Sequence, residues 1–182
     1  MNVFVGGIHG VGKSFLASRA SPILNLLHTS ASNLIKEERA QVTWTIDNRV
    51  SEIDVNQRAL ADAVRRHNSC GTRLMLDGHF VLLDAVGNLS PLPIAVFAAL
   101  NLSSAIVVEA DLQIIAERIE ARRKMKASVE QLEGFLAAER ANAILVCEAL
   151  HIRLSVLHSP TVEEFLRAIS PTSDGVSMCS DS

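Results

Sequence analysis

The sequence lacks the features that mark membrane, secreted or metal-scaffold proteins. Its longest uninterrupted apolar run, Ile94–Leu100, is far shorter than the roughly 18 residues that a membrane-spanning helix needs. No basic-then-apolar leader stands at its start, so we expect no secretion signal. The three cysteines have no CxxC spacing, which argues against a disulfide framework or a zinc site and favours a reducing cytoplasm. They are Cys70, Cys147 and Cys179.

An excess of positive charge is also missing. The chain has 17 Lys and Arg against 20 Asp and Glu, a net charge of −3, so we expect no broad electrostatic binding of nucleic acid. Its 182 residues, 48% of them apolar, fit one globular domain with its own core. The segment Pro171–Ser182 contains almost no large apolar residues, which predicts a disordered tail after the domain.

Short apolar runs alternate along the chain with longer helical patterns. The runs are nearly continuously apolar, as in strands buried on both faces of a parallel sheet. They are Val3–Ile8, Leu74–Asp77, Ala105–Glu109 and Arg153–Leu157. Helices are predicted over about 51–67, after Asp111, and after capping-box patterns that begin at Ser128 and Thr161. This alternation predicts a three-layer α/β domain with right-handed crossovers.

The strongest motif is Gly7–Ser14, which reads GIHGVGKS and matches the phosphate-binding pattern GxxxxGK[ST] between a strand and a helix. Glycines let successive backbone N–H groups converge on phosphate oxygens, and the following helix adds its positive end. Lys13 would reach the β- and γ-phosphates, and Ser14 would offer its hydroxyl to Mg²⁺. We therefore predict that ATP is bound by Gly7, Ile8, His9, Gly10, Val11, Gly12, Lys13 and Ser14.

A phosphate loop also needs a carboxylate near its metal ion, at the end of a neighbouring strand. Asp77 ends the run Leu74–Asp77 and is predicted to hold Mg²⁺ through a water molecule, because Mg²⁺ gives up its waters reluctantly. The pair Asp77-Gly78 could instead be a simple turn. Glu109, which ends the next apolar run, is the alternative metal ligand.

The order of motifs resembles that of the archaeal-type adenylate kinases, a branch of the P-loop nucleoside monophosphate kinases. The phosphate loop is followed by Leu-Asp-Gly-His-Phe-Val at 76–81, a Pro-rich turn at 90–93, Val-Val-Glu-Ala-Asp at 107–111 and an arginine-rich helix. The resemblance covers about 1–169. It implies a three-layer P-loop NTPase fold with a doubly wound five-stranded parallel sheet over 1–170. A monophosphate-binding segment at about 29–68, a short lid at about 118–128 and a homo-oligomer would go with that fold.

The resemblance also implies roles for single residues. Lys13 and the lid arginines Arg118, Arg122 and Arg123 would be catalytic, stabilising the charge of the moving phosphoryl group. The acceptor would be held by Ser30, Ser32, Arg49, His79 and Arg140. Simpler readings stay open: a helix cap for Ser32, a solvated helix residue for Arg49, a structural role for His79 and a basic helix end for the lid arginines.

These residues predict in-line transfer of a phosphoryl group from MgATP to a nucleoside monophosphate, with AMP favoured. No general base is required, because the acceptor phosphate is already ionised. Two departures weaken the assignment of AMP: Leu82-Leu83 stand where the family carries an arginine, and the lid is short. The alternatives are a kinase of another small metabolite, and an ATP-binding switch or slow ATPase that acts through a partner.

Overall fold

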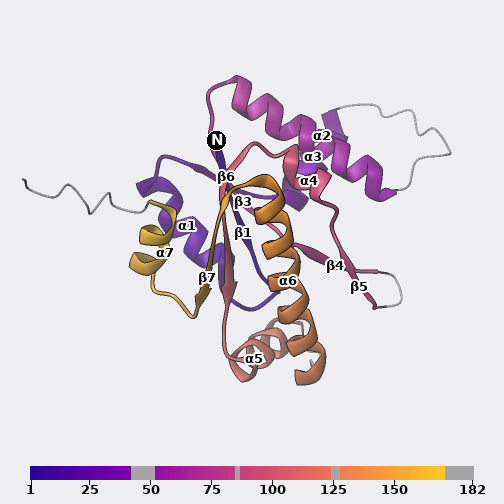
Figure 1. The fold of residues 1–182 in the computed structure, drawn as a ribbon, viewed down its shortest axis with the longest axis vertical. Helices are drawn as coiled ribbons and strands as arrows, with labels where there is room; N and C mark the ends of the chain where they lie inside the picture. The colour runs from indigo at the N-terminus through magenta and orange to yellow at the C-terminus, as the bar shows by residue number, and fades with distance from the viewer. Residues whose placement is uncertain (42–51, 85–86, 124–127, 171–182) are drawn as a thin grey trace, which may run out of the picture.

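The computed structural model describes residues 1–41, 52–84, 87–123 and 128–170. Its centre is a parallel sheet with the strand order β2-β3-β1-β6-β7. The strands are β1 (Asn2–Gly6), β2 (Leu27–Ser30), β3 (Leu74–Asp77), β6 (Leu102–Glu109) and β7 (Arg153–His158). Helices cover both faces of this sheet, so the predicted three-layer α/β fold with five parallel strands is confirmed (Figure 1).

Successive side chains of the central strands point alternately into two separate cores, one on each face of the sheet. Phe4 and Leu76 pack into the core on one face of the sheet, while Val5 and Met75 pack into the core on the other. Both faces of a strand are therefore buried, which is why these strands read as continuous apolar runs and not as alternating ones. The edge strand β2 is half-exposed and carries polar residues, so no apolar run predicted it.

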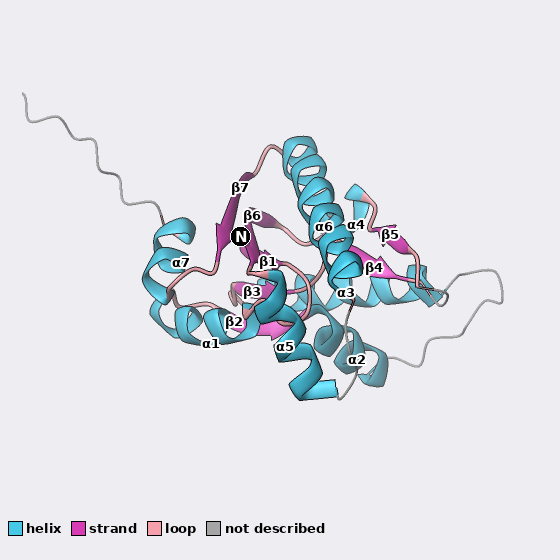
Figure 2. Cartoon of the chain, turned by 90° about the horizontal axis from the view of Figure 1, so that it is seen from below, coloured by secondary structure: helices cyan, strands magenta, loops and turns pink. Residues whose placement is uncertain are grey.

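The helices divide between the two cores (Figure 2). One layer contains α1 (Lys13–Ile23), α5 (Leu112–Arg123) and α7 (Val162–Ile169). The opposite layer contains α2 (Ala31–Gln41), α3 (Glu52–Ser69) and α4 (Ile94–Ala98). The long helix α6 (Val129–Leu150) contributes to both cores, with Leu132 in the first and Val146 in the second. All four predicted helices are present, and both capping residues accept the expected backbone hydrogen bond. Ser128 accepts from the N–H of Gln131, and Thr161 forms a full capping box with Glu164.

A small antiparallel hairpin interrupts the α/β alternation between β3 and α4. It consists of β4 (Val81–Leu83) and β5 (Leu89–Pro91), and the predicted Pro-rich turn contributes its second strand. The side chain of Asn142 on α6 donates to the carbonyl oxygens of Phe80 at 2.7 Å and Leu92 at 3.0 Å. These bonds fix the segment after Asp77 against α6, next to the carboxyl ends of the strands.

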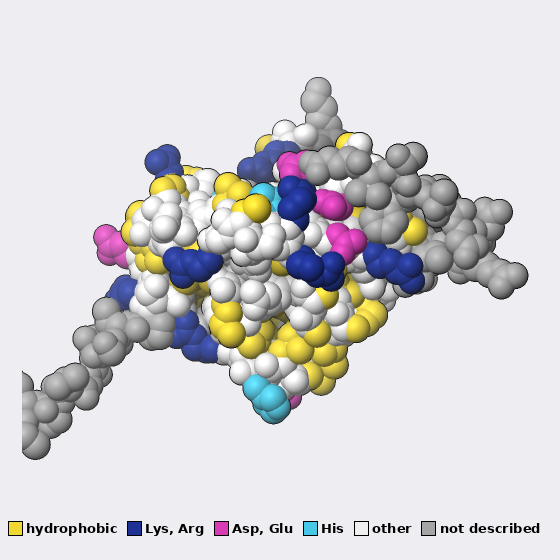
Figure 3. All heavy atoms as spheres, turned by 90° about the horizontal axis from the view of Figure 1, so that it is seen from above, with side chains coloured by type: hydrophobic (Ala, Val, Ile, Leu, Met, Phe, Trp, Pro, Cys, Tyr) yellow, Lys and Arg dark blue, Asp and Glu magenta, His cyan; other side chains and the backbone are white. Residues whose placement is uncertain are grey.

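Some of the predicted residues and segments lie outside the part of the chain that the structure describes. Arg49, part of the lid and the tail at 171–182 lie outside the described residues. Among the residues described, no helix is both long and apolar enough to cross a bilayer. On the face seen in Figure 3, basic and acidic side chains are interspersed. A cytoplasmic location, a homo-oligomer and the lack of nucleic-acid binding stay predictions.

Candidate phosphate-binding site

The loop that follows β1 lies at the carboxyl ends of the parallel strands. Because β1 pairs with β3 on one side and β6 on the other, the loop opens where the chain leaves the centre of the sheet. Ligands of open α/β sheets bind at this position. The loop leads directly into α1, whose first residue is Lys13, so the free N–H groups of that helix start face the same space.

Three glycines give the loop its shape. Gly7, Gly10 and Gly12 have φ angles of 133°, 92° and 101°, which L-residues with a side chain adopt only with strain. Gly7 is also crowded, since a Cβ there would lie 2.3 Å from the carbonyl oxygen of Val108 on β6. The glycines are therefore needed for the path of the backbone, as the sequence pattern predicts.

We expect Gly7→Ala to destabilise the fold and to abolish nucleotide binding. The new methyl group would force the loop away from β6, and steric strain of this kind costs about 3 kcal/mol or more. Gly71→Ala is the matched control, because Gly71 also has a positive φ of 77° but open space around it. Gly71→Ala should lower the free energy of unfolding by only about 1 kcal/mol. Urea unfolding of both variants measures the difference, and equal losses would show that contact with Val108 is unimportant.

Lys13 is folded back into its own loop. Its Nζ donates hydrogen bonds to the carbonyl oxygens of Gly7 at 2.6 Å and Ile8 at 3.1 Å, and only 7% of the residue is exposed. Burial lowers the pKa of this ammonium, and the nearby carboxylates of Asp77 and Glu139 offset only part of that effect. The predicted phosphate-binding cation is thus held inside the loop that would receive the phosphates.

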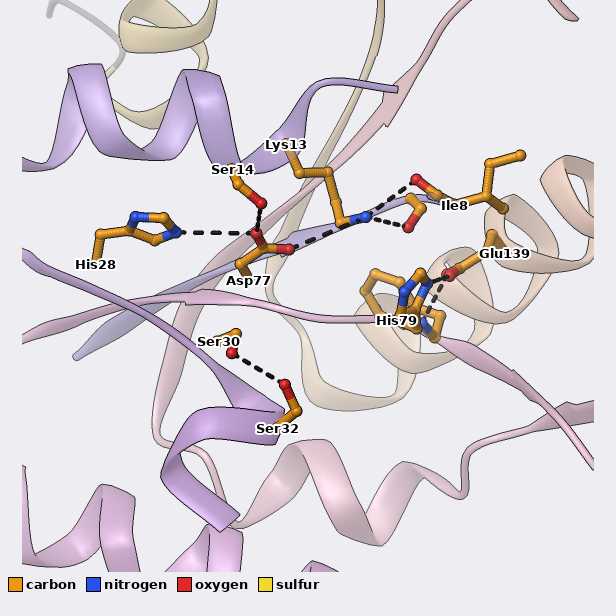
Figure 4. A network of polar contacts seen from close by, with 11 residues as sticks. Ile8, Lys13, Ser14, His28, Ser30, Ser32, Asp77, His79 and Glu139 are labelled. Carbon is orange, nitrogen blue, oxygen red and sulfur yellow. Dashed lines mark hydrogen bonds and ion pairs between the residues drawn. The ribbon is translucent and has the colours of Figure 1, made fainter. Parts of the chain in front are cut away.

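Asp77 lies at the end of β3, beside the first turn of α1. Its Oδ2 accepts a 2.5 Å hydrogen bond from the hydroxyl of Ser14, and its Oδ1 lies 4.0 Å from Nζ of Lys13 (Figure 4). Burial alone would raise the pKa of Asp77, but His28, Ser14 and Lys13 together outweigh it and lower the pKa below its usual value. Asp77 is therefore a carboxylate. Together with the Ser14 hydroxyl it forms the oxygen pair that suits Mg²⁺.

His28 stands behind this pair and was missed by the sequence analysis. Its buried Nε2 has no hydrogen-bond partner among the described residues and lies 3.8 Å from Oδ2 of Asp77. It belongs to β2, the edge strand that no apolar run predicted, so no local pattern indicated a histidine beside Asp77.

His79 is paired with a buried acid on α6. Its Nδ1 lies 2.8 Å from Oε1 of Glu139, whose other oxygen accepts the backbone N–H of Phe80 at 2.6 Å. Glu139 is completely buried. It was missed by the sequence analysis, although an acid at position 139 interrupts the spacing of the apolar face of α6. Such a residue is either paired or functional.

The predicted arginines differ in what their side chains contact. Arg118 on α5 donates to the carbonyl oxygen of Gly10 at 2.9 Å, so it contacts the phosphate loop across 108 residues of sequence. Arg122 is exposed one turn farther along the same helix, and the side chain of Arg123 is outside the described part. Arg140 forms a bidentate ion pair with Glu109. This ion pair therefore engages both Glu109, the alternative metal ligand, and Arg140, a predicted acceptor-binding residue.

The two predicted serines lie next to the site, and one of them also caps a helix. The hydroxyl of Ser30 accepts a hydrogen bond from the N–H of Asn33 at 3.1 Å, so Ser30 and not Ser32 caps α2. The Ser32 hydroxyl lies 3.0 Å from that of Ser30. Both serines face the cavity described next.

One cavity of about 500 Å³ joins the phosphate loop to the space beneath α2, α3 and α4. Its polar end contains the loop and strand-end residues Lys13, Ser14, Asp77 and His79, with Ser30 and Ser32 on the rim. The rest of the lining is mainly apolar, with Asn56 and Gln57 of α3 as polar members. Its apolar side chains are Phe4, Ile35, Leu60, Leu92, Val96, Phe97 and Leu100. A volume of this size is typical of a small-molecule site.

Comparisons with known proteins agree with this geometry. The model of the AAA domain family matches residues 6–135. A putative kinase from Chloroflexus aurantiacus J-10-fl is 14% identical at a TM-score of 0.53, with 93% of this chain and 96% of that chain covered. A gluconokinase from Sinorhizobium meliloti 1021 is 12% identical at a TM-score of 0.52, with 92% and 87% covered. These likenesses show the fold alone. No curated protein matches the sequence.

Proposed function

Because the chain belongs to the AAA domain family and has the fold of P-loop kinases, we propose that it is a phosphotransferase. It would move the γ-phosphoryl group of MgATP to a small molecule. One observation carries the proposal: Lys13, Ser14, Asp77 and His79 line a single cavity that continues into a mainly apolar space. The phosphate loop and a pocket for a second molecule are therefore continuous.

The described residues suit MgATP at the polar end of this cavity. The loop amides and the ammonium of Lys13 would bind the phosphates, once Nζ leaves the carbonyl oxygens of Gly7 and Ile8. Ser14 and Asp77 would hold Mg²⁺, which neutralises phosphate charge when bound. Arg118 lies beside the loop through Gly10 and is placed to contact a phosphate oxygen after a small movement.

The acceptor is the finer part of the proposal. Resemblance to adenylate kinases favours a nucleoside monophosphate, AMP first, whose phosphate would need arginines such as Arg49 or Arg140. Arg140 is engaged by Glu109, and Arg49 is outside the described part. The apolar wall and the pairing of His79 favour the other candidate, a neutral metabolite that carries a hydroxyl group.

An assay of ADP formation across both acceptor classes tests the proposal. With Mg²⁺ and ATP, we expect at least one acceptor to raise ADP formation at least about tenfold above hydrolysis by water alone. The acceptors are AMP, CMP, GMP, UMP and dTMP, each set against its neutral nucleoside. ATP that binds and is hydrolysed at a rate no acceptor changes would instead identify a switch or ATPase and would refute the phosphotransferase.

A further inference from the structure

We propose that the outer face of α6 binds a second copy of this chain, in a two-fold symmetric dimer whose α6 helices run antiparallel. The inference goes beyond the proposed phosphotransferase activity and does not depend on it. It follows from three features of the molecule: the apolar outer face of α6, the groove beside that face and the placement of Arg140 and Glu148.

The second half of α6 is apolar on its exposed side as well as on its buried side. Beyond Arg140, Glu148 is the sole charged residue of the helix. Ile144 is 40% exposed and Leu145 is 59% exposed. Small apolar residues complete the exposed face, namely Ala137, Ala141 and Ala149. A helix that is apolar all round is normally covered on every side, so the outer face of α6 lacks its cover in the single chain.

A groove of about 480 Å³ extends this face from α6 to the edge strand β7. Ile144 and Cys147 line it from the helix, and Ile152 and Leu154 line it from the chain that enters and forms β7. Val156, the next residue on the same face of β7, is 40% exposed. Figure 2 shows α6 on the outside of its layer, between β7 and α4, and Figure 3 shows apolar side chains gathered along the lower side of that view. An exposed apolar surface that continues over two elements is typical of a protein interface.

The charges on α6 indicate both the partner and its orientation. Arg140 and Glu148 lie about two turns apart on one face of the helix, with Ile144 midway between them. If two copies of α6 pack antiparallel about Ile144, each Arg140 faces the other copy's Glu148. A parallel pair would instead place like charges opposite one another, which is unfavourable. The face is therefore complementary to itself, as a two-fold symmetric interface requires.

Both charged side chains are available for these contacts. Glu148 is exposed, and its carboxylate has no hydrogen-bond or ion-pair partner among the described residues. Arg140 uses Nε and Nη2 to bind Glu109, so within the described ranges its Nη1 makes no hydrogen bond. The Arg140 side chain is 52% exposed, so the ion pair with Glu109 fixes its position without covering it.

The proposed interface lies on the same helix as residues that shape the candidate site. On the inner side of α6, Glu139 accepts the backbone N–H of Phe80, and Asn142 donates to the carbonyl oxygen of the same residue. A second copy packed on the outer side would therefore hold in place the helix that supports one wall of the cavity.

Sedimentation equilibrium of the full chain tests the proposal. We expect the native chain to dimerise with a Kd near or below about 10 μM. Ile144→Glu and Leu145→Glu should each raise this Kd at least about 100-fold, because the two-fold symmetry places every substitution in the interface twice. Ile114→Glu is the matched control, since Ile114 on α5 is also an isoleucine that is 40% exposed. Its Kd should equal that of the native chain.

Glu148→Lys tests the orientation of the two helices. In the antiparallel arrangement it turns two attractive pairs with Arg140 into repulsive ones, so the Kd should rise about tenfold or more. In a parallel arrangement one pair of like charges would only replace another, and an unchanged Kd would refute the antiparallel dimer. A lysine in the last turn of a helix is favourable, so the substitution should not unfold the single chain.

Thermal melts at several protein concentrations provide the second measurement. The melting temperature of the native chain should rise with concentration, because only folded chains dimerise, whereas those of Ile144→Glu and Leu145→Glu should not. A native chain that is still monomeric at about 100 μM, with a melting temperature independent of concentration, would overturn the proposal. A dimer that neither α6 variant weakens would also overturn it. Formation of ADP is not measured in these experiments, so failure of the proposed function would be recognised separately.

Discussion

Replacement of Lys13 by methionine is expected to lower kcat for phosphoryl transfer by about 10³-fold or more. Lys13 is a buried cation within the phosphate loop, and its attraction to the moving phosphoryl group is strengthened because water is excluded there. Methionine keeps most of the stem volume, so we expect the melting temperature to change by only a few degrees. The ADP assay and a thermal melt of the same sample measure the two effects.

Lys36→Met is the control, because Lys36 is exposed on α2. It should leave both kcat and the melting temperature unchanged, since exposed lysines contribute little. A Lys13→Met variant that is folded and retains more than about a tenth of native kcat would show that this ammonium does not act on the transferred group. The role of the loop in phosphate transfer would then have to be abandoned.

Asp77→Asn is expected to raise the Mg²⁺ concentration needed for half-maximal activity by about 10- to 100-fold. An amide removes the negative charge near the metal and changes its hydrogen bond with Ser14 from a charge-assisted one to a neutral one. ATP without Mg²⁺ should bind as well or better, because a carboxylate close to the phosphates is gone. Titration of activity with Mg²⁺ separates this effect from a loss of ATP affinity measured by calorimetry.

Asp62→Asn is the matched control for that titration. Asp62 forms an exposed pair with Arg65 on α3, and such pairs contribute less than about 1 kcal/mol. Its Mg²⁺ requirement should equal that of the native chain. If Asp77→Asn left the Mg²⁺ requirement unchanged, another carboxylate would have to be the metal ligand. Glu109 would be the first to test, although Arg140 now neutralises it.

The sheet was predictable wherever strands are buried on both faces. Leu74–Asp77 was predicted with its observed bounds, because all four residues are buried and the next one is glycine. β6 begins three residues before its predicted start. Ser103 and Ser104 are polar, so the search for an apolar run did not include the first residues of the strand. β2 and the hairpin β4–β5 are partly exposed, so their side chains carry no continuous apolar signal.

The site was predictable only where a local pattern defines it. The phosphate loop is contained within eight consecutive residues, and Asp77 follows a recognisable strand. Glu139 and His28 act through partners 60 and 49 residues away along the chain, and no local spacing encodes such a pair. The engagement of Arg140 by Glu109 likewise depends on how α6 crosses the end of β6.

The central place of β1 has a consequence for synthesis of the chain. β1 leaves the ribosome before both of the strands that flank it in the sheet, and the second of these neighbours, β6, is complete only at Glu109. Until then Gly7 lacks the β6 backbone against which it packs. A nascent chain should therefore be unable to capture ATP until β6 has emerged, although the phosphate loop itself is translated well before that strand.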